Sequence, residues 1–188
     1  MAPGAPAPNR YTSERFFALV DDALLHPEDR VELLEGVIVS MSPSNPRHAS
    51  AITRVHDALG KAFGPGHVVR VQQPFVAEPE SVPEPDVAVV PGGHADYDEA
   101  HPTRALLVVE VADTSLVQDR LTKSRVYAAA GVPEFWIVNL RDGVVEVPRG
   151  PDPAARCYGE RRVLARGERI EVAAVTGARV AVDDLLAG

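Results

Sequence analysis

The apolar residues of the chain recur with two different periods, one typical of helices and one typical of strands. Large apolar side chains lie three or four positions apart near the N-terminus, again before Gly64 and again after residue 117, as on one buried helix face. Thr12 or Ser13 can cap the first helix, and Gly131 followed by Pro133 ends the last. The predicted helices cover residues 13–26, 52–63 and 118–130.

Between and after these helices the apolar positions alternate or form short runs, which indicates strands. Glu35-Gly36 predicts a tight hairpin connection, and a loop rich in Gly, Pro and acids covers residues 91–104. The Pro- and Gly-rich residues 148–153 predict a break in the later strands. The predicted strands are 31–34, 37–41, 68–76, 86–90, 105–111, 135–138 and 144–147, with weaker signals near 162–164, 170–172 and 180–182.

The composition bounds the organisation of the chain. With 188 residues and 45% hydrophobic content, the chain can bury one substantial core, so we expect a single domain over residues 11–188. Residues 1–10 form a Pro/Ala/Gly tail that we expect to be disordered. Neither a membrane span nor a secretory signal is recognisable, so we expect a cytoplasmic protein. The one cysteine, Cys157, excludes an internal disulfide.

The net charge of −8 argues against a general nucleic-acid binder, whose surface is normally basic. An acidic total can still conceal a basic groove, and carboxylates that bind a metal themselves add negative charge. All but two of the 19 basic residues are arginine, and the exceptions are Lys61 and Lys123. Lysine can have its pKa lowered by burial and act near neutral pH, so a lysine at a candidate site is of interest.

Glu110 interrupts an apolar run, residues 106–112, that otherwise predicts a buried strand. A lone carboxylate there must shift its pKa, find a partner or bind a cation. Asp86 begins the preceding apolar run, and Lys123 lies thirteen positions after Glu110. Adjacent strands could bring the two acids together as hard oxygen ligands for Mg²⁺ or Mn²⁺. Alternatively, Glu110 and Lys123 could form a structural ion pair, and Asp86 could merely begin a strand.

Asp119, Lys123 and Tyr127 follow one another at intervals of four residues on the helix predicted after the Glu110 strand. Side chains at this spacing share one stripe of a helix, and the stripe could face a metal site. Asp119 could instead only support the helix by pairing with Lys123, and Tyr127 could be a core aromatic residue.

A family resemblance rests on an ordered set of short motifs. They are Glu32-Leu33-Leu34-Glu35-Gly36, Ser42-Pro43-Ser44, Arg47-His48, Pro85-Asp86-Val87, Val109-Glu110-Val111, Asp119, Lys123, Tyr127 and the stretch 129–138. In this combination they resemble the bacterial Uma-two family, which is described largely as restriction endonuclease within the PD-(D/E)XK nuclease superfamily. The resemblance extends from about residue 11 to about residue 147 and is weaker beyond.

The resemblance implies a restriction-endonuclease-like α/β fold, with a mixed β-sheet flanked by helices and, in this chain, extra C-terminal strands. It also implies that Asp86 and Glu110 bind Mg²⁺ or Mn²⁺, that Lys123 orients or activates the attacking water, and that Glu32 is an auxiliary acid. Glu32 could instead be a solvated hairpin residue, and His48 could start a helix rather than act as a base.

One departure from the superfamily pattern concerns the lysine. Where the superfamily has Glu-x-Lys, this chain has Glu110-Val111-Ala112, so the strand itself carries no lysine. Lys123 would have to reach the same place from the following helix.

Two functions are therefore carried forward. The first is a Mg²⁺-dependent endonuclease that hydrolyses phosphodiester bonds of nucleic acid, with DNA as the expected substrate, and catalytic residues Asp86, Glu110, Lys123 and Glu32. The second is a catalytically silent protein of the same fold that binds nucleic acid or a protein partner, which the acidic total favours. The glycine-rich loops of nicotinamide or nucleoside-triphosphate enzymes do not occur. Exposed edge strands would suit a homodimer.

Overall fold

A mixed six-stranded sheet forms the centre of the computed structural model, which describes residues 10–186. Residues 1–9 of the expected tail lie outside the described residues. Neighbouring strands run antiparallel except for the parallel pair β5 and β6. In sheet order, which is also chain order, the strands are β3 (His67–Val71), β4 (Val87–Pro91), β5 (Leu107–Ala112), β6 (Phe135–Asn139), β7 (Val144–Asp152) and β8 (Cys157–Ala165).

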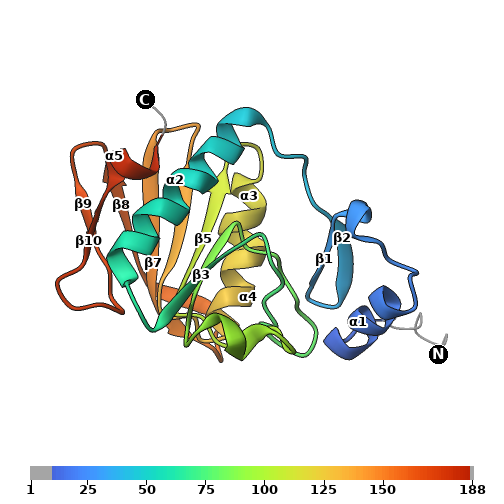
Figure 1. Cartoon of the computed structure of the whole chain (residues 1–188). Coiled ribbons are helices and arrows are strands. Elements are labelled where there is room, and N and C mark those ends of the chain that lie inside the picture. The colour runs from blue at the N-terminus through green and yellow to red at the C-terminus, as the bar shows by residue number, and fades with distance from the viewer. Residues whose placement is uncertain (1–9, 187–188) are drawn as a thin grey trace.

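Helices cover both faces of this sheet (Figure 1). On one face lies α2 (Pro46–Phe63), whose N-cap Asn45 accepts a hydrogen bond from the backbone N–H of His48 at 3.0 Å. On the other face lies the crossover that a parallel strand pair requires. It consists of α3 (Leu116–Gln118), the π-helical turn η3 (Asp119–Lys123) and α4 (Ser124–Ala129).

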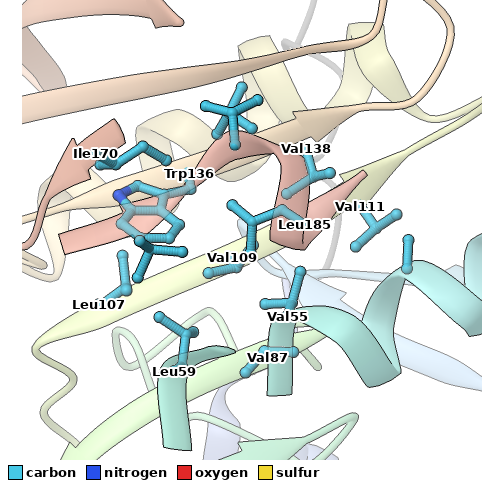
Figure 2. Packing of buried hydrophobic residues seen from close by; sticks show 14 of the residues in the cluster. Val55, Leu59, Val87, Leu107, Val109, Val111, Trp136, Val138, Ile170 and Leu185 are labelled. Atoms are coloured by element: carbon cyan, nitrogen blue, oxygen red, sulfur yellow. The ribbon is translucent and has the colours of Figure 1, made fainter. Parts of the chain in front are cut away.

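The alternation along β5 divides the core into two clusters, because successive side chains of a strand point to opposite faces. Leu107, Val109 and Val111 pack towards α2, together with Val55 and Leu59 of that helix (Figure 2). Val108 and Ala112 pack towards α4. Glu110 belongs to this second face, so its carboxylate lies between the sheet and the crossover.

The N-terminal segment forms a third, smaller cluster beside the sheet. It contains α1 (Ser13–Asp21), the short 3-10 turn η1 (Pro27–Asp29), β1 (Val31–Leu34) and β2 (Val37–Ser40). The hairpin turns at Glu35-Gly36 as predicted, with φ of +48° and +79°, values typical of a two-residue type I′ turn. Phe16, Leu33 and Val82 form the cluster that attaches this segment to the rest of the chain.

The C-terminal strands β9 (Arg169–Glu171) and β10 (Arg179–Ala181) form a separate small sheet, followed by α5 (Val182–Leu185). Their apolar residues join the cluster under α2. The prediction of a mixed sheet flanked by helices, with extra C-terminal strands, is therefore confirmed.

Two strand predictions were wrong at their ends. Strand β3 stops at Val71, because Gln72 takes a left-handed conformation with φ of +48° and Pro74 follows. Strand β7 continues through the predicted break to Asp152, paired with β8. Prolines are accepted there because the regular ladder with β6 ends at Glu146 and only an isolated bridge, between Arg149 and Glu134, follows it on that side.

Two segments have finer structure than predicted. The loop 91–104 contains a short 3-10 helix, η2 (His94–Tyr97). The helix predicted over 118–130 is interrupted by the π-helical turn. Within residues 10–186, no helix is long and apolar enough to cross a membrane.

Candidate active site

The strand register brings Asp86 and Glu110 to the same end of the sheet. Val87 of β4 pairs with Val109 of β5, so the next residues along the two antiparallel strands, Asp86 and Glu110, lie side by side on one face. The Asp86 carboxylate accepts the backbone N–H of Val111 at 2.8 Å. Both acids are nearly inaccessible, with 7% and 3% exposure.

Lys123 connects this strand pair to the N-terminal hairpin. Its Nζ lies 3.0 Å from Oε1 of Glu110 and 3.2 Å from Oε2 of Glu32, and the residue is only 6% exposed. Glu32 on β1 is 2% exposed and also accepts the backbone N–H of Glu84 at 3.1 Å. Glu32 is therefore no solvated hairpin residue.

The π-helical turn places both Asp119 and Lys123 inward. A π-helical turn is wider than an α-helical one, and such turns occur often at functional sites. Asp119 accepts a hydrogen bond from the Ser115 hydroxyl at 2.6 Å. Tyr127, one turn further along, is buried and donates its hydroxyl hydrogen bond to Oε1 of Glu110.

A cavity of about 60 Å³ lies between these side chains. All four residues expected to be catalytic line it, together with His48 and Asp119. Sequence reasoning missed the other lining residues, because they lie in loops or at the ends of the recognised elements and carry no local signal for the site. These are Arg30, Met41, Ser42, Gln72, Glu84, Ser115 and Gln118.

His48 lines the cavity, whereas Asp113 lies outside the lining. Nε2 of His48 lies 3.3 Å from Oδ2 of Asp86, and this interaction raises the pKa of His48. Asp113 is not among the lining residues; it accepts a hydrogen bond from Asn45 at 2.7 Å and so supports the N-terminus of α2, which carries His48.

The buried charges shift one another's pKa values. Burial raises the pKa of Glu110 well above its ordinary value. Burial alone would lower the pKa of Lys123, but the carboxylates of Glu110 and Glu32 outweigh it and raise the pKa. The sequence-based idea of a lysine with a lowered pKa is therefore wrong here, because the adjacent carboxylates favour the charged ammonium. Lys123 stays an ammonium ion near neutral pH.

The residues around the cavity suit a hard divalent cation. Five carboxylates line it, against one lysine and one arginine, so added positive charge is favourable. Among residues 10–186, Oε2 of Glu110 accepts no hydrogen bond from the protein. No three His, Cys, Asp or Glu side chains in this part of the chain form a ready-made ligand group. Mg²⁺ fits such a place, because it keeps several waters and needs only one or two carboxylates.

Asp119→Asn is expected to stabilise the protein at neutral pH. Burial raises the pKa of Asp119 to about 6, so the folded state holds a proton that the unfolded state releases near pH 4. Stability from this group is then lost as pH rises from about 4 to about 6. We expect the variant to gain about 3 kcal/mol at pH 7 and to gain much less at pH 4. Urea denaturation at both pH values tests this, and an equal change at both would contradict it.

Comparisons with known proteins show the family and the fold of the chain. Residues 14–183 match the model of the Uma2 family, whose description is "Putative restriction endonuclease". This is the Uma-two family that the motifs resemble, so the resemblance is confirmed. A similar solved structure is that of "a putative nuclease belonging to DUF820" from Anabaena variabilis. The TM-score is 0.71 at 15% sequence identity, over 93% of this chain and 97% of that chain, which shows a shared fold. Among curated proteins, none matches this chain.

Proposed function

Because the chain belongs to the Uma2 family, we propose that it is a Mg²⁺- or Mn²⁺-dependent endonuclease of the PD-(D/E)XK type that hydrolyses phosphodiester bonds, with DNA as the expected substrate. The observation that carries the proposal is the meeting of Asp86, Glu110, Glu32 and Lys123 at one cavity. Asp86 and Glu110 would hold the cation. When bound, the cation would stabilise charge on the phosphoryl oxygens and make an attacking water more acidic.

Lys123 contributes as a donor in this proposal. Since its pKa is raised, the ammonium cannot accept a proton from water near neutral pH. It can donate hydrogen bonds to a water or to a phosphoryl oxygen on which negative charge develops. Glu32 is a second contact of the ammonium, beside Glu110, and helps to hold it in place. Lys123 therefore orients the reacting groups, and Glu32 is a positioning residue.

Removal of the metal tests the proposal on the wild-type protein. We expect cleavage of labelled single- or double-stranded DNA with Mg²⁺ or Mn²⁺, no cleavage with a chelator, and recovery when Mg²⁺ is returned in excess. Either ion should also stabilise the fold by about 2.7 kcal/mol when present at about one hundred times its dissociation constant. Single- and double-stranded RNA substrates show whether the protein cleaves DNA, RNA or both.

The control is Asp86→Ala, which should lose the metal-induced stabilisation. If neither ion stabilises the wild type and both proteins leave all four substrates intact, the nuclease proposal fails. The silent alternative, a partner-binding protein of this fold, would then be preferred, and the net charge of −8 already favours it.

Three further expectations stay predictions. They are the single domain over residues 11–188, the cytoplasmic location and the homodimer. The dimer would use an edge of the six-stranded sheet, where β3 and β8 are the outermost strands.

A further inference from the structure

A second and wider cleft adjoins the candidate active site. It has a volume of about 520 Å³ and lies between the N-terminal segment and the loops beside the sheet. Arg30, Gln72 and Glu84 line both this cleft and the small cavity, so the two spaces share a wall. A ligand in the cleft would therefore lie next to a group held at the carboxylates.

One side of the cleft is aromatic and apolar. Phe17 of α1 and His101 stack with ring centroids 5.3 Å apart and an angle of 19° between the rings. Phe17 is half-buried and His101 is exposed, so a flat ligand can reach this pair. Burial, followed by the charge of Arg70, lowers the pKa of His101 and keeps its ring neutral. Phe16, Val20, Leu25 and Pro74 complete the apolar lining.

The shared wall carries polar groups that are suited to a ligand edge. The guanidinium of Arg30 forms no ion pair among the described residues, and Arg30 is exposed. Gln72 donates a hydrogen bond to Oδ1 of Asp86 at 3.3 Å and so connects the cleft to a proposed metal ligand. Arg30 and Gln72 both have left-handed backbones, with φ of +46° and +48°. Such backbone conformations cluster at functional sites.

We infer that this cleft binds one unpaired nucleobase of the strand whose phosphodiester lies at Asp86 and Glu110. The inference rests on the proposed function and specifies its substrate. A base offers a flat face for the Phe17–His101 pair and polar edge groups for Arg30 and Gln72. A base inside a regular duplex cannot present its face in this way. The preferred substrate is therefore a single strand, or a duplex with a flipped or unpaired nucleotide.

Binding of short single-stranded oligonucleotides tests the inference, with Ca²⁺ replacing Mg²⁺ to limit cleavage. One DNA oligonucleotide carries a single fluorescent 2-aminopurine, and a matched one has an abasic position there; RNA versions test the sugar. We expect the 2-aminopurine emission to change on binding and the abasic strand to bind about tenfold more weakly. Phe17→Ala should lose about tenfold in affinity for the normal strand, and Phe17→Trp should retain it.

The control variant is Val37→Ala, which shortens an exposed apolar side chain of the same N-terminal segment outside the cleft. It should bind as the wild type does. If the wild type binds normal and abasic strands equally, or if folded Phe17→Ala binds as tightly as wild type, the inference is overturned. The abasic comparison needs no variant, so it holds even if Phe17→Ala does not fold. Because this experiment measures binding, a failure of the nucleobase inference can be told apart from a failure of the proposed function, which is measured by cleavage.

Discussion

Asp86→Asn is expected to lower the rate of phosphodiester hydrolysis by about 1,000-fold with little loss of stability. The substitution removes a negative charge from the proposed metal site, and metal stabilisation of a transition state amounts to several kcal/mol. Each 1.4 kcal/mol corresponds to about tenfold in rate. Asparagine keeps an oxygen that can accept the 2.8 Å hydrogen bond from the Val111 backbone, so the strand pair stays in place. Initial cleavage rates at saturating Mg²⁺ give the measurement.

A matched control for this variant is Asp57→Asn. Asp57 is an exposed acid on α2 that does not line the cavity, and its substitution changes the net charge by the same amount. We expect it to cleave at the wild-type rate. An Asp86→Asn protein that keeps both the rate and the Mg²⁺ dependence of the wild type would remove Asp86 from the proposed mechanism.

Lys123→Met should produce the largest loss of stability, about 3–5 kcal/mol, together with loss of activity. The ammonium is the charge partner of two buried acids, at 3.0 Å from Glu110 and 3.2 Å from Glu32. Without it, these carboxylates must stay ionised in a buried place, beside other acids, or take up a proton. Urea denaturation at pH 7 measures the free energy of unfolding.

A second substitution separates the loss of charge from the loss of packing. Glu110→Gln in the Lys123→Met background removes one unpaired acid. The double variant should therefore be more stable, by about 1–3 kcal/mol, than the sum of the two single-variant effects predicts. Lys61→Met is the control, since Lys61 is the other lysine of the chain and is exposed on α2. A loss below about 1 kcal/mol for Lys123→Met would mean that water reaches these charges freely.

The parts of the site that the sequence predicted are those marked by a local pattern of apolar, acidic and turn residues. Short apolar runs identified β4 and β5, and an acid at the start of one and within the other indicated that adjacent strands could bring Asp86 and Glu110 together. The turn residues Glu35-Gly36 fixed the hairpin that carries Glu32. Burial of Glu32 could not be read from this pattern, because it depends on how the hairpin docks on the rest of the chain. The chemical roles of these residues stay predictions.

What the sequence did not predict depends on contacts between distant segments. Gln72 and Glu84 enter the cavity from loops, and Gln72 does so because the strand predicted over 68–76 already ends at Val71. The raised pKa of Lys123 results from several acids supplied by different elements. The continuation of β7 through Pro148 and Pro151 depends on where the neighbouring strand β6 ends. In each case the deciding partner is remote in sequence, so no local rule could reveal it.

The wide turn at Asp119–Lys123 also bears on how the length of the chain can vary. A π-helical turn closes with hydrogen bonds from residue i to residue i+5 and so holds one residue more than an α-helical turn. Deleting one residue here would give a regular α-helix in which Tyr127 still faces Glu110. A deletion between Ser124 and Tyr127 of α4 would instead turn Tyr127 by about 100° around the helix axis, away from Glu110. Relatives that keep this contact should therefore differ in length at this turn or at surface loops such as 91–104, and not between Ser124 and Tyr127.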